Sequence, residues 1–115
     1  MARAERAYDF ACDLALERLR DAFDAAGPWL WRLRDSSLLS DYLACIPADD
    51  ARIRVFEYPG PLRVFVGLGD KGYLAMIQVE SGEEQTLAEL DAAFCNLIGT
   101  VGATRVTPIA PFPVP

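Results

Sequence analysis

The chain alternates between stretches in which apolar residues recur every three or four positions and shorter stretches in which they recur at every second position. The first spacing is typical of a helix with one face against a core, and the second is typical of a strand. Residues 3–26 follow the helical spacing through a stripe made of Tyr8, Ala11, Ala15, Leu19, Ala22, Phe23 and Ala26. Gly27 and Pro28 then supply the stop that commonly follows a helix. We therefore predict one long helix over residues 3–26.

Period-two alternation predicts five strands, over residues 29–34, 42–46, 52–58, 62–68 and 73–80. Turn-forming residues separate them, such as the Pro59-Gly60 pair that suits a type II turn. The first of these segments would also fit a helix beginning at Pro28, but the Asp-Ser-Ser sequence that follows it favours a short strand. Residues 104–109 are a further candidate strand, and residues 108–115, which contain four prolines, are expected to form an extended tail.

A second helix is predicted to begin near Thr86, because Thr86 and Glu89 have the spacing of a capping box. Its core stripe would be formed by Leu87, Leu90, Phe94, Leu97 and Val101. Consecutive strands joined by short links pair antiparallel, since parallel pairs need a long crossover. The expected fold class is therefore α+β, a single domain over residues 1–115. It would hold a mostly antiparallel sheet of about five strands, with a long N-terminal helix and a C-terminal helix packed on one face.

The amino-acid composition limits the catalytic and metal-binding chemistry that the chain can be expected to perform. The chain has 115 residues, 52% of them hydrophobic, a net charge of -6 and no histidine. The lack of histidine removes the commonest general base and metal ligand. The three cysteines are widely spaced, with no C-x-x-C pair, which favours reduced core thiols over a zinc or redox site. We therefore expect no cofactor and no metal.

The sequence also argues against targeting signals and against two classes of partner. The first ten residues lack the apolar region of a secretory signal, and no apolar run is long enough for a membrane helix. Arginine outnumbers lysine ten to one, a bias typical of bacterial genes rich in G and C. An acidic chain is a poor general ligand for nucleic acid. The expected protein is bacterial and cytoplasmic, with no membrane or nucleic-acid partner.

The glycines at positions 67, 69 and 72 spell G-x-G-x-x-G directly after a predicted strand. In dinucleotide-binding proteins a helix begins inside this motif and points its N-terminus at the pyrophosphate. The residues that follow Gly72 instead have the pattern of a strand that ends at Ser81-Gly82. The motif is therefore interpreted as a hairpin turn and not as a nucleotide site.

Two surfaces are candidates for partner binding. The first is an acidic ridge of residues spaced four apart on the predicted N-terminal helix, Asp9, Asp13, Glu17 and Asp21. It suits a basic partner, although a plain solvated face explains it more simply. The second is a sheet face that combines arginines with aromatic residues, namely Arg52, Arg54, Phe56, Arg63 and Phe65. Arginine and aromatic residues are enriched at interface hot spots, while cross-strand pairing of arginine with carboxylates is the simpler alternative.

These observations favour a small, non-enzymatic protein-binding module. Its most concrete form is an inhibitor or immunity-type protein that neutralises a basic bacterial toxin by surface binding. The sequence is also compatible with a homodimer. The alternative is a small-ligand-binding domain whose apolar pocket lies between the sheet and the helices and is lined by Trp29, Trp31 and Phe94. An enzyme that uses only arginine and carboxylates such as Asp41 and Glu57 is the third and weakest hypothesis.

Overall fold

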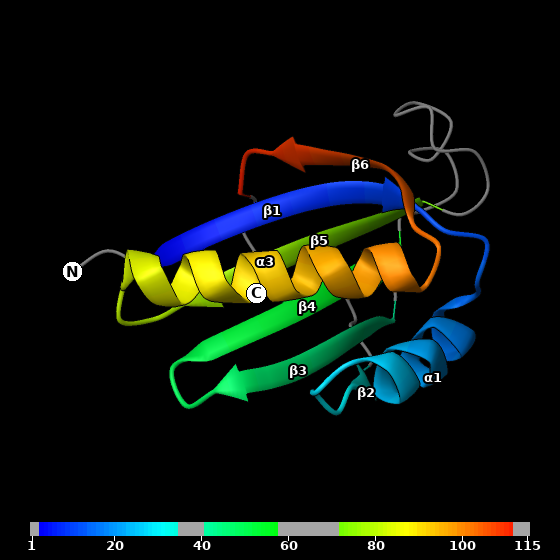
Figure 1. Cartoon of the computed structure of the whole chain (residues 1–115), viewed down its shortest axis with the longest axis horizontal. Coiled ribbons are helices and arrows are strands. Elements are labelled where there is room, and N and C mark those ends of the chain that lie inside the picture. The colour runs from blue at the N-terminus through cyan, green and yellow to red at the C-terminus, as the bar shows by residue number, and fades with distance from the viewer. Residues whose placement is uncertain (1–2, 35–40, 58–71, 112–115) are drawn as a thin grey trace.

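The computed structural model describes residues 3–34, 41–57 and 72–111, which form one antiparallel sheet of six strands and two helices (Figure 1). The strand order is β2-β3-β4-β5-β1-β6. The elements are, in chain order, β1 (Ala4–Ala11), α1 (Leu16–Ala26), β2 (Arg32–Arg34), β3 (Tyr42–Ala48), β4 (Ala51–Glu57), β5 (Gly72–Val79), α3 (Glu84–Thr100) and β6 (Thr104–Ile109). The predicted α+β class with an antiparallel sheet is confirmed.

Both helices lie on the same face of the sheet, with α3 across β5 and β1 and with α1 beside β2 and β3 (Figure 1). The core lies between these two layers. It is built around large side chains that are fully buried, among them Phe10, Leu19, Phe23, Leu43, Ile53, Tyr73, Ile77 and Phe94. The predicted apolar stripe of the second helix supplies Leu87, Phe94 and Leu97 to this core. That part of the sequence interpretation is correct.

The predicted helix over residues 3–26 is wrong in its first half. Residues Ala4–Ala11 form β1, which pairs with β5 on one side and with β6 on the other. The same residues also alternate, because Ala4, Tyr8 and Phe10 all point to the helix layer, where they join the core or pack against it. Hydrogen bonding with strands far away in sequence therefore overrides the helical preference of this segment. Only Leu16–Ala26 becomes helix α1.

Several element ends also differ from the predicted ones. The predicted capping box is not used, because α3 begins at Glu84 and its N-cap residue, Glu83, makes no side-chain capping hydrogen bond. Gly82 precedes this start in a turn with a φ of 76°, a conformation that favours glycine. The predicted strand over residues 29–34 is shortened to Arg32–Arg34, and its helical alternative is not adopted. The predicted strand over residues 62–68 lies outside the described residues.

Strand register divides the sheet side chains between a helix-facing side and a side that neither described helix covers, the helix-free face. Paired residues of β2, β3, β4 and β5 form rows across this face. One row consists of Arg32, Ala44, Arg54 and Met76. Arg34, Tyr42, Phe56 and Leu74 form the next row. The prediction that Arg52, Arg54 and Phe56 share a sheet face is therefore confirmed.

Candidate functional site

Basic side chains gather at one end of the helix-free face. Arg32 and Arg34 lie on β2, Arg52 and Arg54 lie on β4, and β3 runs between the two pairs. Neighbouring strands are about 4.8 Å apart, so the two arginine pairs stand about 10 Å apart at the backbone. Ala44 of β3 lies directly between Arg32 and Arg54 in the register. Ala44 contributes only a single methyl group to this face.

A hollow of about 640 Å³ lies at this place, and we call it the arginine hollow. Its described lining residues are Pro28, Trp29, Leu30, Arg32, Arg34, Tyr42, Ala44, Cys45, Ile46, Pro47, Arg52 and Arg54. Four of these residues are arginines and, within the described part of the chain, none is acidic. A chain with a net charge of -6 thus places a locally positive hollow on one sheet face. Such a surface attracts anions.

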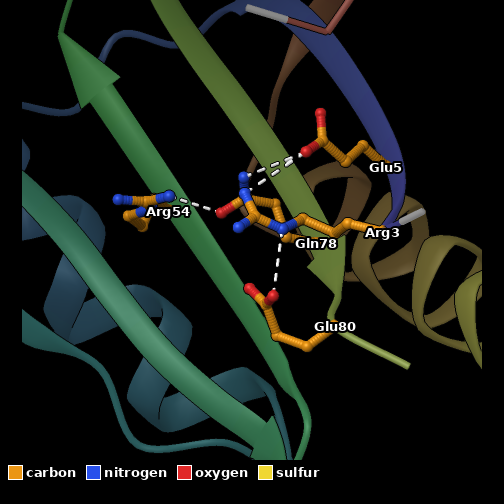
Figure 2. Close-up of polar contacts among 5 residues, drawn as sticks. All are labelled: Arg3, Glu5, Arg54, Gln78 and Glu80. Carbon is orange, nitrogen blue, oxygen red and sulfur yellow. Dashed lines mark hydrogen bonds and ion pairs between the residues drawn. The ribbon is translucent and has the colours of Figure 1, made fainter. Parts of the chain in front are cut away.

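A chain of polar contacts holds Arg54 in place (Figure 2). The guanidinium of Arg54 donates to Oε1 of Gln78, and Nε2 of Gln78 donates to Oε1 of Glu5 over 3.4 Å. Arg3 then bridges two carboxylates, with 3.4 Å to Glu5 and 3.1 Å to Glu80. The side chains at the centre of this network are almost fully buried, at 5% exposure for Arg54 and 3% for Gln78. The network therefore fixes the direction of one arginine of the hollow.

The electrostatic cost of the arginine hollow is visible at Arg54. Burial, followed by the neighbouring positive charge of Arg52, lowers the pKa of Arg54 below its ordinary value. Like charges at close range oppose one another, and a buried charge loses hydration. Burial and the charge of Arg52 therefore both oppose the charged form of Arg54.

Two large apolar side chains stand exposed at the rim of the arginine hollow. Leu30 is 81% exposed and Ile46 is 73% exposed. Both residues also line the hollow. Positive and apolar groups together suit a ligand that has negative charge as well as apolar surface.

The predicted acidic ridge is divided in the structure, because its four residues do not share a helix. Asp9 lies on β1, opposite Leu74 and Thr107, and Asp13 lies in the link between β1 and α1. Only Glu17 and Asp21 remain one turn apart on α1. The continuous helical ridge is therefore wrong as geometry, since half of its predicted helix is a strand.

The remaining predicted binding residues, Arg63 and Phe65, lie outside the described residues. The first two glycines of the G-x-G-x-x-G motif also lie outside them, but Gly72 is described and begins β5. The segment that follows the motif is therefore a strand, as expected, and not the helix that a dinucleotide site requires.

The aromatic residues proposed for an apolar pocket mainly pack against one another. The Trp31 ring lies 4.8 Å from Phe23 and 6.4 Å from both Trp29 and Phe94, measured between ring centroids. Trp31 and Phe94 are buried core residues, whereas Trp29 is half-buried and lines the arginine hollow. The hollow therefore lies beside this aromatic cluster and not between the sheet and the helices.

A second polar cluster, the Asp91 cluster, joins β1 to α3 on the other face of the sheet. Asp91 accepts a hydrogen bond of 2.5 Å from the Tyr8 hydroxyl and forms an ion pair of 2.6 Å with Arg6. The Cys95 thiol lies 3.8 Å from the same carboxylate. Burial, followed by the hydrogen bond to Asp91, raises the pKa of Tyr8, and burial raises that of Cys95. The contacts of Asp91 with Arg6 and Tyr8 connect β1 to α3.

Other reactive or charged groups of the described residues lie away from the arginine hollow and the Asp91 cluster, with the exception of Cys45, which lines the hollow. All three cysteines are free, and burial raises the pKa of Cys45 to about 12. A smaller hollow of about 440 Å³ is lined by Glu17, Arg18, Asp41 and Glu57 together with apolar residues. Among the residues in the three described ranges, no group of acidic or cysteine side chains has an arrangement that could hold a metal ion. In the same ranges, no helix is long and apolar enough to cross a membrane.

Comparison of the sequence with models of known protein families and with curated proteins finds no match. The assignment of the site therefore rests on the chemistry of its residues. Of the sheet residues named from the sequence, Arg52 and Arg54 line the hollow, whereas Phe56 is not among its lining residues, and Ala44 was not singled out. The alternation of β3 marks Ala44 as a small residue on a strand face, but only the register shows that arginines flank it.

Proposed function

We propose that this chain is a protein-binding module that receives an acidic segment of another protein in the arginine hollow. The observation that carries the proposal is the set of four arginines around one hollow, with no acidic residue among its described lining residues. Charged groups of one sign repel each other, and a ligand of opposite sign removes that repulsion. Binding would thus offset a cost that is built into the free protein.

The character of the rim supports a protein ligand over a small ion. Leu30 and Ile46 offer apolar contact next to the charges, and Trp29 and Tyr42 add aromatic surface within the same hollow. Interfaces between proteins combine arginine and aromatic residues in this way. A protein segment with both carboxylate and apolar side chains uses all of these groups at once.

A small organic anion is a second occupant that the volume of the hollow favours. Small-molecule sites usually measure about 300–1,000 Å³, and the arginine hollow, at about 640 Å³, falls inside that range. This alternative keeps the ligand-binding function predicted from the sequence but moves it from the sheet–helix interface to the helix-free face.

The toxin-inhibitor form of the proposal needs a different surface, because a basic toxin is repelled by the arginine hollow. The helix layer is suitable for it: α3 contains no basic residue, and Glu84 and Glu89 are exposed on it. Glu17 and Asp21 extend this acidic character onto α1. A basic partner bound to the helix layer is therefore the second candidate function.

Titration with two peptides of opposite charge separates these candidates. An oligoglutamate peptide and an oligolysine peptide of equal length are added to the isotopically labelled protein, and backbone amide shifts are followed by NMR. We expect oligoglutamate to shift the amides of β2, β3 and β4. Shifts confined to α1 and α3 with oligolysine, and none with oligoglutamate, would replace the first proposal by the second.

A further inference from the structure

The sheet has two edge strands, β2 and β6, which lie on opposite sides of it and differ in their regularity (Figure 1). On β6, Pro108 lacks a backbone N–H and Arg105 has a φ of 53°. The pairing of β6 with β1 also shifts register. Such irregularities hinder the addition of a further strand. β2, in contrast, pairs with β3 over three consecutive residues without a shift, and no described strand lies on its outer side.

Exposure alternates along residues 30–34, which lead into β2 and form it. Leu30, Arg32 and Arg34 are exposed, whereas Trp31 is buried and Leu33 is half-buried. This pattern is typical of an extended segment that turns one side to the core and the other to solvent. Positions two residues apart on a strand are separated by about 6.8 Å, so the two arginines stand in a row along the edge. In the described part of the chain, neither of them forms an ion pair with a carboxylate.

We infer that the acidic segment of the partner binds as an additional antiparallel strand along the outer edge of β2, with carboxylate side chains opposite Arg32 and Arg34. This inference rests on the proposed function and specifies the form and the place of its partner. Both arginines line the arginine hollow, so the added strand lies along the border of that hollow. Main-chain hydrogen bonds to an exposed sheet edge supply affinity, and the alternate side chains supply specificity. Opposite charges on facing residues of neighbouring strands add to the stability of the pairing.

The charge of β2 excludes a competing occupant, which is the same edge of a second copy. Two β2 strands paired antiparallel about Leu33 would bring Arg32 of each copy opposite Arg34 of the other. Like charges in directly opposite positions destabilise strand pairing. Short, charged edge strands are a common protection against self-association. The same charges attract an acidic strand, so the edge of β2 discriminates between a partner and another copy of this chain.

Leu30 specifies the sequence of the added strand. In an antiparallel strand, the residues that face Arg34, Arg32 and Leu30 follow one another at alternate positions from the N-terminus to the C-terminus. The matching segment therefore has an acidic, an acidic and an apolar residue at alternate positions. A suitable probe is a seven-residue peptide with glutamate at its second and fourth positions, leucine at its sixth and threonine elsewhere, because threonine favours strands.

Backbone pairing is tested with two methylated versions of this peptide. One version has N-methyl groups at its even positions and the other at its odd positions. Each modification removes the N–H groups from one edge of the peptide strand and leaves its charges unchanged. Only one edge of the peptide faces β2, so one version should bind the wild-type chain at least tenfold more weakly than the unmodified peptide. The other version should bind within threefold of it, as measured by fluorescence anisotropy at low salt.

The position of the added strand is tested with variants of the chain. Arg32→Gln with Arg34→Gln removes both charges that face the peptide, and the affinity for the unmodified peptide should fall at least tenfold. The matched control is Arg52→Gln, because Arg52 is exposed in the same hollow but lies on β4, two strands away from the edge. This control should bind the peptide within twofold of the wild-type affinity.

The outcomes distinguish the inference from the proposed function. Equal effects of the two methylated versions, or equal losses in Arg52→Gln and in the double variant, would overturn strand addition at β2 and leave an acidic partner in place. Failure of the wild-type chain to bind either the unmodified peptide or oligoglutamate would overturn the proposed function and the inference with it. Loss of binding with one methylated version alone, together with dependence on Arg32 and Arg34, would establish both.

Discussion

The Asp91 cluster and the arginine hollow use similar residues on opposite faces of one sheet, yet their charges are arranged differently. In the Asp91 cluster one carboxylate accepts from Arg6 and from Tyr8, so charge and hydrogen bonding are balanced within the molecule. In the arginine hollow four cations gather without an acidic residue among the described lining residues. The Asp91 cluster connects two elements of the fold, whereas the arginine hollow is the surface for which we propose an acidic partner.

The largest effect should come from breaking the balanced cluster. Replacing Asp91 with alanine removes the acceptor of a part-buried tyrosine hydroxyl, and we expect unfolding to become easier by about 1.5–3 kcal/mol. Chemical denaturation followed by circular dichroism measures this change. The matched control is Glu89→Ala on the exposed side of the same helix, for which the change should stay within about 0.5 kcal/mol. Equal effects of the two variants would show that the Asp91 cluster does not connect β1 to α3.

Reversing charge in the arginine hollow should instead weaken ligand binding and leave stability intact. The double variant Arg32→Glu with Arg52→Glu should lose at least tenfold in affinity for oligoglutamate, about 1.4 kcal/mol, while its stability is unchanged or slightly raised. The control is Arg18→Glu with Arg20→Glu, which changes the net charge equally on α1. Isothermal titration calorimetry and thermal denaturation of both variants test this contrast. A similar loss of affinity in the control would show that net charge alone governs binding.

Alkaline pH sharpens the comparison, because the Asp91 cluster contains groups whose folded-state pKa values are raised. Tyr8 titrates near 10 when unfolded, and its folded pKa is higher. Its contribution to stability is therefore complete below pH 10, and it declines as the pH rises above 10 towards the folded pKa. The slope attributable to Tyr8 is at most about 1.4 kcal/mol per pH unit. Thermal melts between pH 8 and pH 11 should show a shallower decline for Tyr8→Phe, and an unchanged slope would contradict the assignment.

The smallest effect concerns the apolar rim of the arginine hollow. Leu30→Ser should leave the free energy of unfolding within about 0.5 kcal/mol of wild type, because the side chain is 81% exposed. Affinity for an acidic peptide that also contains leucine should fall roughly threefold. Val106→Ser, a 39% exposed position on the opposite edge strand, should leave that affinity unchanged and is the matched control. Fluorescence anisotropy with a labelled peptide is sensitive enough for this comparison.

Local sequence patterns predicted the elements whose apolar spacing fits only one structure. The second helix and the strands β3, β4 and β5 were recognised because their alternation or helical stripe is unambiguous. The segment that forms β1 satisfies both periods, and its neighbours in sequence favoured the helical one. Only pairing with β5 and β6 selects the strand, and these residues lie far along the chain.

The residues of the candidate site also differ in how far a local sequence pattern could reveal them. Arg52 and Arg54 could be assigned to one face because they lie two residues apart on a single strand. The hollow between Arg32 and Arg54 depends on the register of three strands, which no local pattern specifies. Asp91 was equally hidden, since its partners lie more than eighty residues earlier in the chain.

The position of β1 has a consequence for the making of this protein. β1 leaves the ribosome before both of its partner strands, which are formed by residues 72–79 and 104–109, so its pairing must wait until those residues are made. Contacts between such distant residues slow folding, because a long loop must close before they form. During this interval the segment Ala4–Ala11 has unpaired backbone groups and a sequence that is also suited to a helix.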